Sequence, residues 1–295
     1  MLPKGNYALS IAHPGHELRL HGFIEQVKPF TFLFADGSGK DIPSLFTNAQ
    51  DCIYNAMMND LNLSPRELAS EKWMRILYLS RKVEGSSNQY IKEEEIINEI
   101  LEQRTGFFIF YINFLTTNLI KWNIDYIVSD PREGYNVLHD ICSIVTKLAV
   151  KLVKKVKDKK IIQYQYALNN KYENIGDGCI HIVLDDLAIE RKIKSIVNYH
   201  PSVYNELSSY LGEELTEQIK LCSNNKTLVK ELLNTTDKEI FRNEHLCPFN
   251  TEHGEIPYYE LNGEKLVTAG IYPKVISYKK HIIPLKEQLT AKIEF

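Results

Sequence analysis

Two histidines flank a short motif near the start of the chain, HPGHE at residues 13–17. The residues before it, 8–12, are apolar or small, which predicts a short buried strand that Pro14 then ends. Apolar residues recur at helical spacing after the motif, and Glu17 suits the first turn of a helix. The motif is therefore predicted to be a strand-to-helix turn. His13 and His16 can converge there on one metal ion, or they can be ordinary surface or capping residues.

A third histidine, His139, has the same setting. Residues 124–130 form another apolar stretch typical of a strand, Pro131 ends it, and a helix is expected from about residue 137 to 156. Repeated strand-to-helix order predicts an α/β, Rossmann-like fold with a mostly parallel sheet and helices on both faces. Ligands bind such sheets in the crevice at the carboxyl ends of the strands. His13 and His139 are therefore expected to face one crevice.

Two aspartates are also expected at strand ends. Residues 29–36 form a short run rich in strand-forming residues that finishes at Asp36, and Asp130 finishes the stretch before Pro131. Asp36 either approaches the crevice or serves as an ordinary turn aspartate. We expect both side chains to lie at the carboxyl ends of strands in the same sheet as His13.

The remaining patterns divide the chain into a core at residues 1–200 and a largely helical extension at 201–295, packed on the core. No low-complexity linker separates the two parts. Further strands are expected at residues 161–167 and 179–184. Further helices are expected at residues 49–61, 64–78, 91–122, 185–199, 202–211, 213–221, 225–233 and 235–243, and a loop at 246–263.

Composition is that of an ordinary globular protein, with 44% hydrophobic and 25% charged residues. No apolar run is long enough to span a bilayer and no signal segment is evident, so a soluble, cytoplasmic protein is expected. A net charge of -3 gives no nucleic-acid footprint. The five cysteines are scattered without a CxxC pair, which favours reduced thiols over a disulfide framework or a thiolate zinc site. They are Cys52, Cys142, Cys179, Cys222 and Cys247.

Two of these segments resemble the PIG-L/LmbE-like family of zinc-dependent N-deacetylases. The family's first signature is AHPDDE after the opening strand, and residues 12–17 read AHPGHE. Its second signature, HPDH after a later strand, resembles residues 136–139, where the last histidine agrees. The resemblance covers roughly residues 5–200 and does not reach the extension.

The resemblance implies a zinc ion bound by His13, His139 and His16, the last in place of an aspartate. Three neutral imidazoles are a recognised zinc set that leaves a fourth position for water or substrate. The family's general base is replaced by Gly15, which has no side chain. Asn136 stands where the family has an imidazole that stabilises the oxyanion or protonates the leaving group.

Another carboxylate is then needed as base, and Glu133, Asp140, Asp36 and Glu17 are the candidates. The leading interpretation is a metal-dependent hydrolase in which metal-bound water attacks the carbonyl of an N-acyl amino sugar or related small-molecule amide. The alternative is a non-catalytic protein of the same fold that binds a ligand or partner. In a third interpretation the histidines are structural. The oligomeric state is not predicted.

Overall fold

The computed structural model describes residues 2–38, 42–58, 75–78, 80–81, 89–166, 178–222, 226–249 and 256–294. Seven strands form one sheet in the order β3-β2-β1-β6-β7-β9-β8. These strands are β1 (Tyr7–Ile11), β2 (Phe30–Leu33), β3 (Ile76–Tyr78), β6 (Tyr126–Ser129), β7 (Ile162–Tyr166), β8 (Ile180–Val183) and β9 (Asn243–Pro248). A separate antiparallel pair joins β4 (Ser80–Arg81) to β5 (Gln89–Tyr90). The predicted α/β fold with a mostly parallel sheet is confirmed.

The centre of the sheet is the point at which its strand order reverses. β1 pairs in parallel with β2 on one side and with β6 on the other. The chain continues outward from β2 to β3 and, on the other side, from β6 to β7. Such a reversal opens a crevice at the carboxyl ends of the central strands. His13 follows β1, Asp36 follows β2 and Asp130 follows β6, as predicted.

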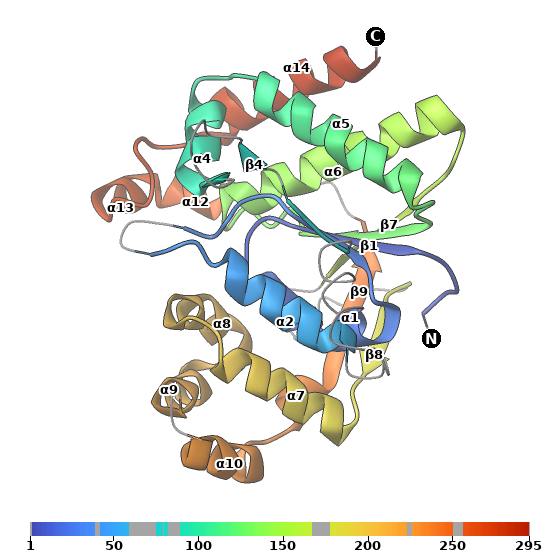
Figure 1. Cartoon of the computed structure of the whole chain (residues 1–295). Helices are drawn as coiled ribbons and strands as arrows, with labels where there is room; N and C mark the ends of the chain where they lie inside the picture. The colour runs from blue at the N-terminus through green and yellow to red at the C-terminus, as the bar shows by residue number, and fades with distance from the viewer. Residues whose placement is uncertain are drawn as a thin grey trace.

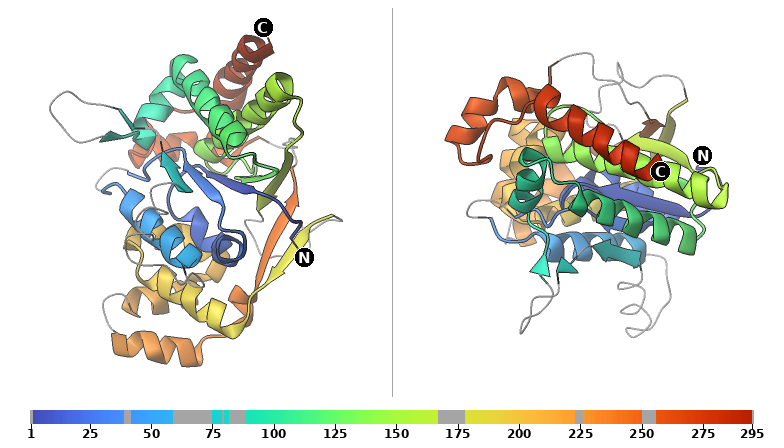
Figure 2. Two further views of the ribbon diagram at one scale, coloured as in Figure 1. Left: turned by 45° about the vertical axis from the view of Figure 1, so that its right-hand side comes forward. Right: turned by 90° about the horizontal axis from the view of Figure 1, so that it is seen from above.

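Helices cover both faces of the sheet, as Figure 1 shows. The right-hand view of Figure 2, from above, shows the helices of one face lying over the strands. Those on this face are α4 (Glu93–Leu101), α5 (Gly106–Lys121), α6 (Val137–Lys157) and α14 (Ile283–Glu294). The other side holds α1 (His21–Val27), α2 (Phe46–Met58), α7 (Asp186–Val197), α8 (Tyr204–Leu211), α9 (Glu213–Cys222) and α10 (Lys226–Thr235). In the described part of the chain, no helix has the length and apolar character needed to cross a membrane.

The core is split by the sheet into two clusters of buried apolar side chains. Alternation along β1 divides its residues between them, because successive strand side chains point to opposite faces. Leu9 and Ile11 belong to the cluster beneath α1, α2 and α7, whereas Ala8 belongs to the cluster beneath α5 and α6. All five residues of β1 are buried. Burial on both faces fixes the position at which the strand ends and His13 begins the turn.

α6 is the longest described helix, with 21 residues, and it begins where the sequence predicted. Asn136 is its N-cap, and the Asn136 side-chain oxygen accepts a hydrogen bond from the backbone N–H of Leu138 at 2.9 Å. The cap fixes the first turn, which carries His139 on the buried side of the helix.

The segment after residue 200 contributes one strand to the main sheet. β9 lies between β7 and β8 and is antiparallel to both. Leu246, which was expected to begin a loop, is instead paired with Tyr166. The other elements of this segment are helical, which agrees with the expected extension. Its short elements are η3 (Pro201–Val203), α11 (Glu239–Arg242), α12 (Tyr258–Leu261), α13 (Gly263–Thr268) and a π-helical turn at Tyr278–Ile282.

Two predicted helices differ in the structure. The helix expected at 64–78 ends in strand β3, in which Ile76 pairs with Thr31 of β2, so pairing with the sheet overrides the local pattern. Most of that predicted helix lies outside the described residues. The long helical region at 91–122 is two helices, α4 and α5. Gln103, between them, has a left-handed backbone with φ 56°, which interrupts the helix.

The prediction that all the cysteines are reduced is wrong for one pair. Cys179, which directly precedes β8, and Cys247, in the neighbouring strand β9, form a disulfide. The two cysteines are 68 residues apart in the sequence, and they become neighbours because β9 pairs with β8. The sequence pattern therefore does not indicate this pairing. The free cysteines of the described chain, Cys52, Cys142 and Cys222, are buried.

A buried ion pair ties β9 to the helices below the sheet. The Lys192 ammonium of α7 donates to the Glu244 carboxylate of β9 at 2.8 Å, and both side chains are almost completely buried. The same carboxylate accepts hydrogen bonds from the backbone N–H groups of Gly22 and Phe23 in α1, at 2.9 and 2.8 Å. A buried charge is tolerated because it has an opposite charge and further hydrogen bonds.

Replacing Lys192 by Met should therefore lower the free energy of unfolding by about 3–5 kcal/mol, because it leaves the Glu244 carboxylate buried without its counter-ion. Urea unfolding followed by circular dichroism measures the change. Lys238→Met is the matched control, since Lys238 pairs with Glu190 at the surface and an exposed pair contributes about 1 kcal/mol or less. Equal losses in the two variants would contradict the interpretation.

Candidate metal centre

The three histidines that the sequence singled out meet at the carboxyl end of the central strands. His13 and His16 come from the turn after β1, and His139 comes from the first turn of α6. All three are buried, and one nitrogen from each lies within 4.8 Å of the others. The Nε2 atoms of His13 and His139 are 3.0 Å apart. Residues 126 positions apart in the sequence thus form one compact nitrogen cluster.

The outer nitrogens of His13 and His139 both face hydrogen-bond acceptors. His13 Nδ1 lies 3.2 Å from the carbonyl oxygen of Pro14. His139 Nδ1 is hydrogen-bonded to Glu133 Oε1. Neither acceptor carries a proton to donate when Glu133 is ionised, so each Nδ1 is assigned the N–H. The lone pairs of both rings are then on Nε2 and point into the cluster.

The outer nitrogen of His16 is held by two further side chains. His16 Nδ1 lies 2.6 Å from Asp130 Oδ1 and 2.5 Å from the Tyr166 hydroxyl. That hydroxyl donates to the same aspartate oxygen. The second oxygen, Oδ2, accepts the backbone N–H of Ala12 at 2.6 Å. Asp130 thus fixes the tautomer and orientation of His16, as carboxylates do behind metal-binding histidines.

Burial lowers the pKa of His16 well below its usual value, and the neighbouring imidazoles His139 and His13 lower it further. The ring is therefore neutral, which a metal ligand must be.

This donor set fits a divalent metal ion such as zinc. With both Nδ1 atoms protonated, the Nε2 lone pairs of His13 and His139 face each other at 3.0 Å, an arrangement that a shared cation stabilises. Tetrahedral zinc holds nitrogens at about 2.0–2.1 Å, which places two ligands about 3.3 Å apart. Three neutral imidazoles leave a fourth position for water or substrate.

Two polar residues predicted to act in catalysis lie beside the cluster. Asn136 places its Nδ2 atom 3.5 Å from His13 Nε2. Glu133, which contacts His139, has a side chain that is 20% exposed. A partly exposed carboxylate next to the cluster can exchange protons with solvent, whereas a fully buried one cannot do so readily. Glu133 and Asn136 are therefore the best placed of the predicted catalytic residues.

Asp140, the third predicted catalytic residue, is hydrogen-bonded to the loop before α6. It is fully buried. Its two oxygens accept hydrogen bonds from the backbone N–H of Gly134, at 3.1 Å, and from the Tyr259 hydroxyl, at 3.2 Å. These contacts assign Asp140 to positioning the loop that carries Glu133.

Asp36 and Glu17, the other candidate bases, also have structural partners. Asp36 Oδ1 accepts hydrogen bonds from the backbone N–H and the hydroxyl of Ser38, which is the ordinary turn role. Glu17 accepts the backbone N–H of Gly15 at 2.8 Å and the Tyr199 hydroxyl at 2.6 Å. Burial raises the pKa of Glu17, and these hydrogen bonds oppose that rise.

Three tyrosines that support the site were not predicted. Tyr166 ends β7, Tyr199 follows α7, and Tyr259 lies in α12. Each donates its hydroxyl to a buried carboxyl group of the site region: Asp130, Glu17 and Asp140 respectively. Nothing in the local sequence around a tyrosine marks it as such a partner, because the contact depends on distant elements packing together.

The backbone explains the glycine of the HPGHE motif. Gly15 has φ 110°, a conformation that side-chain-bearing residues rarely adopt. A Cβ atom at this position would also lie 3.1 Å from Val203 Cγ1. The turn that delivers His16 to the cluster thus requires glycine where the resembling family has an aspartate.

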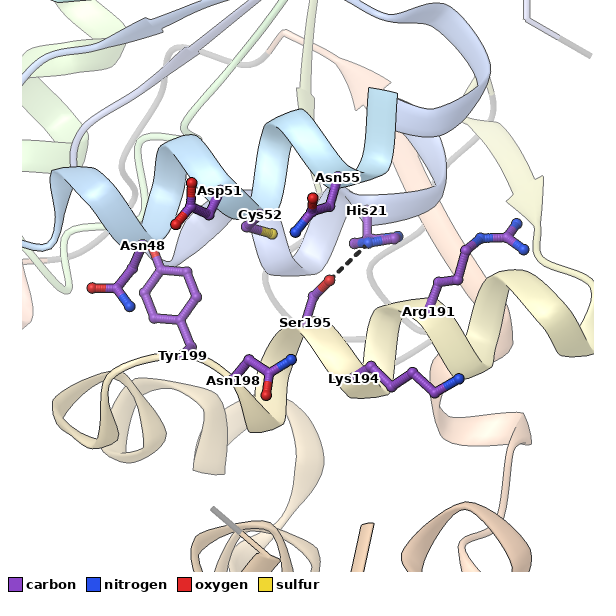
Figure 3. Close-up of a pocket in the computed structure, with 10 residues that line it drawn as sticks. All are labelled: His21, Asn48, Asp51, Cys52, Asn55, Arg191, Lys194, Ser195, Asn198 and Tyr199. Atoms are coloured by element: carbon purple, nitrogen blue, oxygen red, sulfur yellow. Dashed lines mark hydrogen bonds between the residues drawn. The ribbon is translucent and has the colours of Figure 1, made fainter. Parts of the chain in front are cut away.

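A separate pocket of about 340 Å³ lies between α2 and α7, over α1 (Figure 3). His21 Nε2 and Ser195 Oγ are hydrogen-bonded there at 3.1 Å. Burial, and to a lesser extent Lys192 and Arg191, lowers the pKa of His21 to about 3, so that imidazole is neutral. Tyr199 lines the pocket and connects it to Glu17. Its lining residues are His21, Asn48, Asp51, Cys52, Asn55, Arg191, Lys194, Ser195, Asn198 and Tyr199.

No family model matches the sequence, and no curated protein matches it. Among solved structures, the chain is similar to the A40926 pseudoaglycone deacetylase Dbv21, with 13% identity and a TM-score of 0.36 over 86% of this chain and 100% of that one. It is also similar to the zinc-inhibited form of teicoplanin deacetylase Orf2, with 10% identity and a TM-score of 0.33 over 85% of this chain and 100% of that one. Similarity of this size transfers no activity, so the site is interpreted from its own residues.

The purified protein should carry about one divalent ion per chain, with zinc the expected metal. His139→Ala should remove most of it, and Asp130→Asn should weaken zinc affinity about 10- to 100-fold by releasing His16. Elemental analysis and competition with a chelator measure both effects. His181→Ala is the control, because His181 lies in β8, outside the cluster. A wild type that cannot be loaded with zinc, or alanine variants of all three histidines with full occupancy, would exclude the site.

Gly15→Ala should lower the free energy of unfolding by about 1–3 kcal/mol, the usual cost of forcing a side-chain-bearing residue into a strained backbone conformation. Gly106→Ala is the matched control. Gly106 begins α5, and a Cβ atom there would meet nothing within 4 Å. Thermal or urea unfolding distinguishes the two variants. A Gly15 variant as stable as the Gly106 variant would show that the turn tolerates a side chain.

Proposed function

We propose that this protein is a metal-dependent hydrolase of the deacetylase type, acting on an N-acyl amino sugar or a related small amide. The observation that carries the proposal is the cluster of His13, His16 and His139, with each outer nitrogen facing an acceptor and a lone pair left for a metal. The substrate class follows from the resemblance of residues 12–17 and 136–139 to the PIG-L/LmbE-like signatures.

A divalent ion in this cluster supplies a Lewis acid that polarises an acyl carbonyl and makes water a better nucleophile. The protein supplies the orientation. Asp130 and Glu133 hold His16 and His139 in fixed tautomers, so that the ligands do not need to reorganise during the reaction. His16 remains neutral because burial lowers its pKa.

Glu133 and Asn136 are the residues that we assign to the chemical step. The Asn136 Nδ2 group, beside His13, can donate a hydrogen bond to negative charge that develops on the carbonyl oxygen. Glu133, the partly exposed carboxylate, can accept a proton from the attacking water and deliver one to the departing amine. Asp140 keeps the loop between them in place through Gly134.

A second function, non-catalytic ligand binding, is favoured by one specific observation. Gly15 leaves no side chain at the position of the family's general base, and the buried carboxyl groups of Glu17 and Asp140 both accept hydrogen bonds from the protein. Asp36 is hydrogen-bonded to Ser38, so Glu133 is the carboxylate that remains among the four candidates, and it also holds His139. If it does not act as a base, the site binds amides without cleaving them.

Release of free amine from a panel of N-acyl amino sugars by the zinc-loaded protein tests the proposal. We expect measurable turnover that His139→Ala abolishes, and weak or undetectable turnover of simple N-acetylglucosamine derivatives. A positioned base contributes about 10²- to 10⁴-fold in rate, so Glu133→Gln should lower kcat by at least about 100-fold at saturating zinc.

The results separate the two functions. Zinc-loaded wild type that binds the amides but releases no more amine than His139→Ala would favour the non-catalytic alternative. Turnover of simple N-acetyl sugars at about ten per second, typical of competent enzymes, would show that loss of the aspartate at position 15 does not impair the chemistry.

A further inference from the structure

Two exposed tyrosines stack on each other in the part of the molecule that carries Glu133 and Asn136. The rings of Tyr135 and Tyr258 have centroids 5.0 Å apart and an interplanar angle of 22°. Their exposed fractions are 56% and 46%. Exposed aromatic side chains that form a patch, rather than standing singly, mark binding surfaces more often than plain surface.

The partner of Tyr135 comes from the C-terminal segment, which is fixed onto the loop before α6. Tyr259, the residue after Tyr258, is buried and donates its backbone N–H to the Gly134 carbonyl at 3.2 Å. Its hydroxyl donates to Asp140 at 3.2 Å. Figure 1 shows α12 beside the first turn of α6. Tyr258 is therefore held in place by its neighbour, and the stacked pair is a preformed surface.

A second set of contacts holds the same segment farther along. The Arg132 guanidinium donates to the Tyr278 hydroxyl. Glu260, in α12, accepts hydrogen bonds from the Ser277 hydroxyl at 2.9 Å and from the backbone N–H of Tyr278 at 2.7 Å. Residues 258–278 thus pack on the loop at both of their ends. A preformed surface loses little conformational entropy when it binds a ligand.

The stacked pair includes Tyr135, in the loop that also carries Asn136, a neighbour of the imidazole cluster. Tyr135 directly precedes Asn136, whose amide is 3.5 Å from His13 Nε2. Consecutive Cα atoms are about 3.8 Å apart, so the backbone of Tyr135 is separated from the cluster by one such step and the length of the Asn136 side chain. A substrate with its acyl group at the histidines would extend over this surface if it carried a further ring.

We propose that Tyr135 and Tyr258 form a platform on which a second sugar ring of the substrate stacks, next to the ring that carries the acyl group. The inference rests on the proposed function for the location of the acylated ring. Tyrosine suits this task because its face is apolar and its hydroxyl remains in water. The C–H face of a sugar ring is weakly apolar in the same way, while its hydroxyls remain solvated at the edge. The platform would make the protein prefer a disaccharide over a single N-acyl amino sugar.

Equilibrium binding to the zinc-loaded protein tests the platform without relying on turnover. The probes are N-acetylglucosamine and its β-1,4-linked disaccharide, measured by calorimetry on the full chain. We expect the wild type to bind the disaccharide about two- to tenfold more tightly than the monosaccharide. Tyr258→Ala should remove this preference while leaving the monosaccharide affinity unchanged, and Tyr258→Phe should retain it. Phe110→Ala is the control, because Phe110 is also an exposed aromatic residue but lies on α5, away from the stacked pair.

Equal affinity of the wild type for the two probes, or an unchanged preference in Tyr258→Ala, would overturn the platform. A different result is that the wild type gains affinity from a longer acyl chain and not from a second sugar. If Tyr258→Ala removed that gain, the surface would bind the acyl group, and the proposed sugar platform would be wrong. A disaccharide preference that depends on Tyr258 in a protein that releases no amine would support the platform and reject the hydrolase. The two proposals therefore fail separately.

Discussion

The buried carboxyl group of Asp130 is the contact on which the arrangement of the site depends. It lies where β6 ends beside β1, and it accepts hydrogen bonds from the Ala12 backbone, from His16 and from Tyr166. These donors come from the turn after β1 and from β7, so one side chain connects three segments of the sheet. A buried acceptor that lost any of them would carry an unsatisfied lone pair at a cost of about 1–3 kcal/mol. That cost keeps the His16 ring pointed toward His13 and His139.

The C-terminal segment also supports the end of the sheet at which the three histidines lie. β9 enters the sheet beside β7, whose last residue, Tyr166, reaches Asp130. Farther along the chain, Tyr259 donates hydrogen bonds to Gly134, in the loop that carries Glu133 and Asn136, and to Asp140. The site is therefore assembled from both halves of the chain, although all three candidate metal ligands come from the first half. This arrangement gives a physical reason for residues beyond 200 to affect the chemistry of the centre.

The backbone conformation at Gly15 decides which side chain can stand at this position of the turn, and so whether a general base can stand there. Its positive φ and the contact with Val203 restrict the position to glycine. The same geometry removes the side chain that the resembling family uses as a base. The chain offers three imidazole nitrogens that could hold a metal ion, while its carboxyl groups at Glu17, Asp140 and Asp130 serve the structure. A protein with this turn can hold a metal firmly and still be slow, unless Glu133 takes over the proton transfer.

The sequence alone determined the elements that lie close together along the chain. The apolar runs at residues 8–12 and 124–130 and the prolines that end them, Pro14 and Pro131, are local signals, so the strand-to-helix turns and their three histidines were predicted from them. The tertiary structure decided what each carboxylate does and which distant residues touch. The Tyr166, Tyr199 and Tyr259 contacts, the Cys179–Cys247 disulfide and strand β9 depend on pairings across the sheet. Such contacts form because packing brings far-apart segments together, and no local pattern in a single sequence records which segments those are.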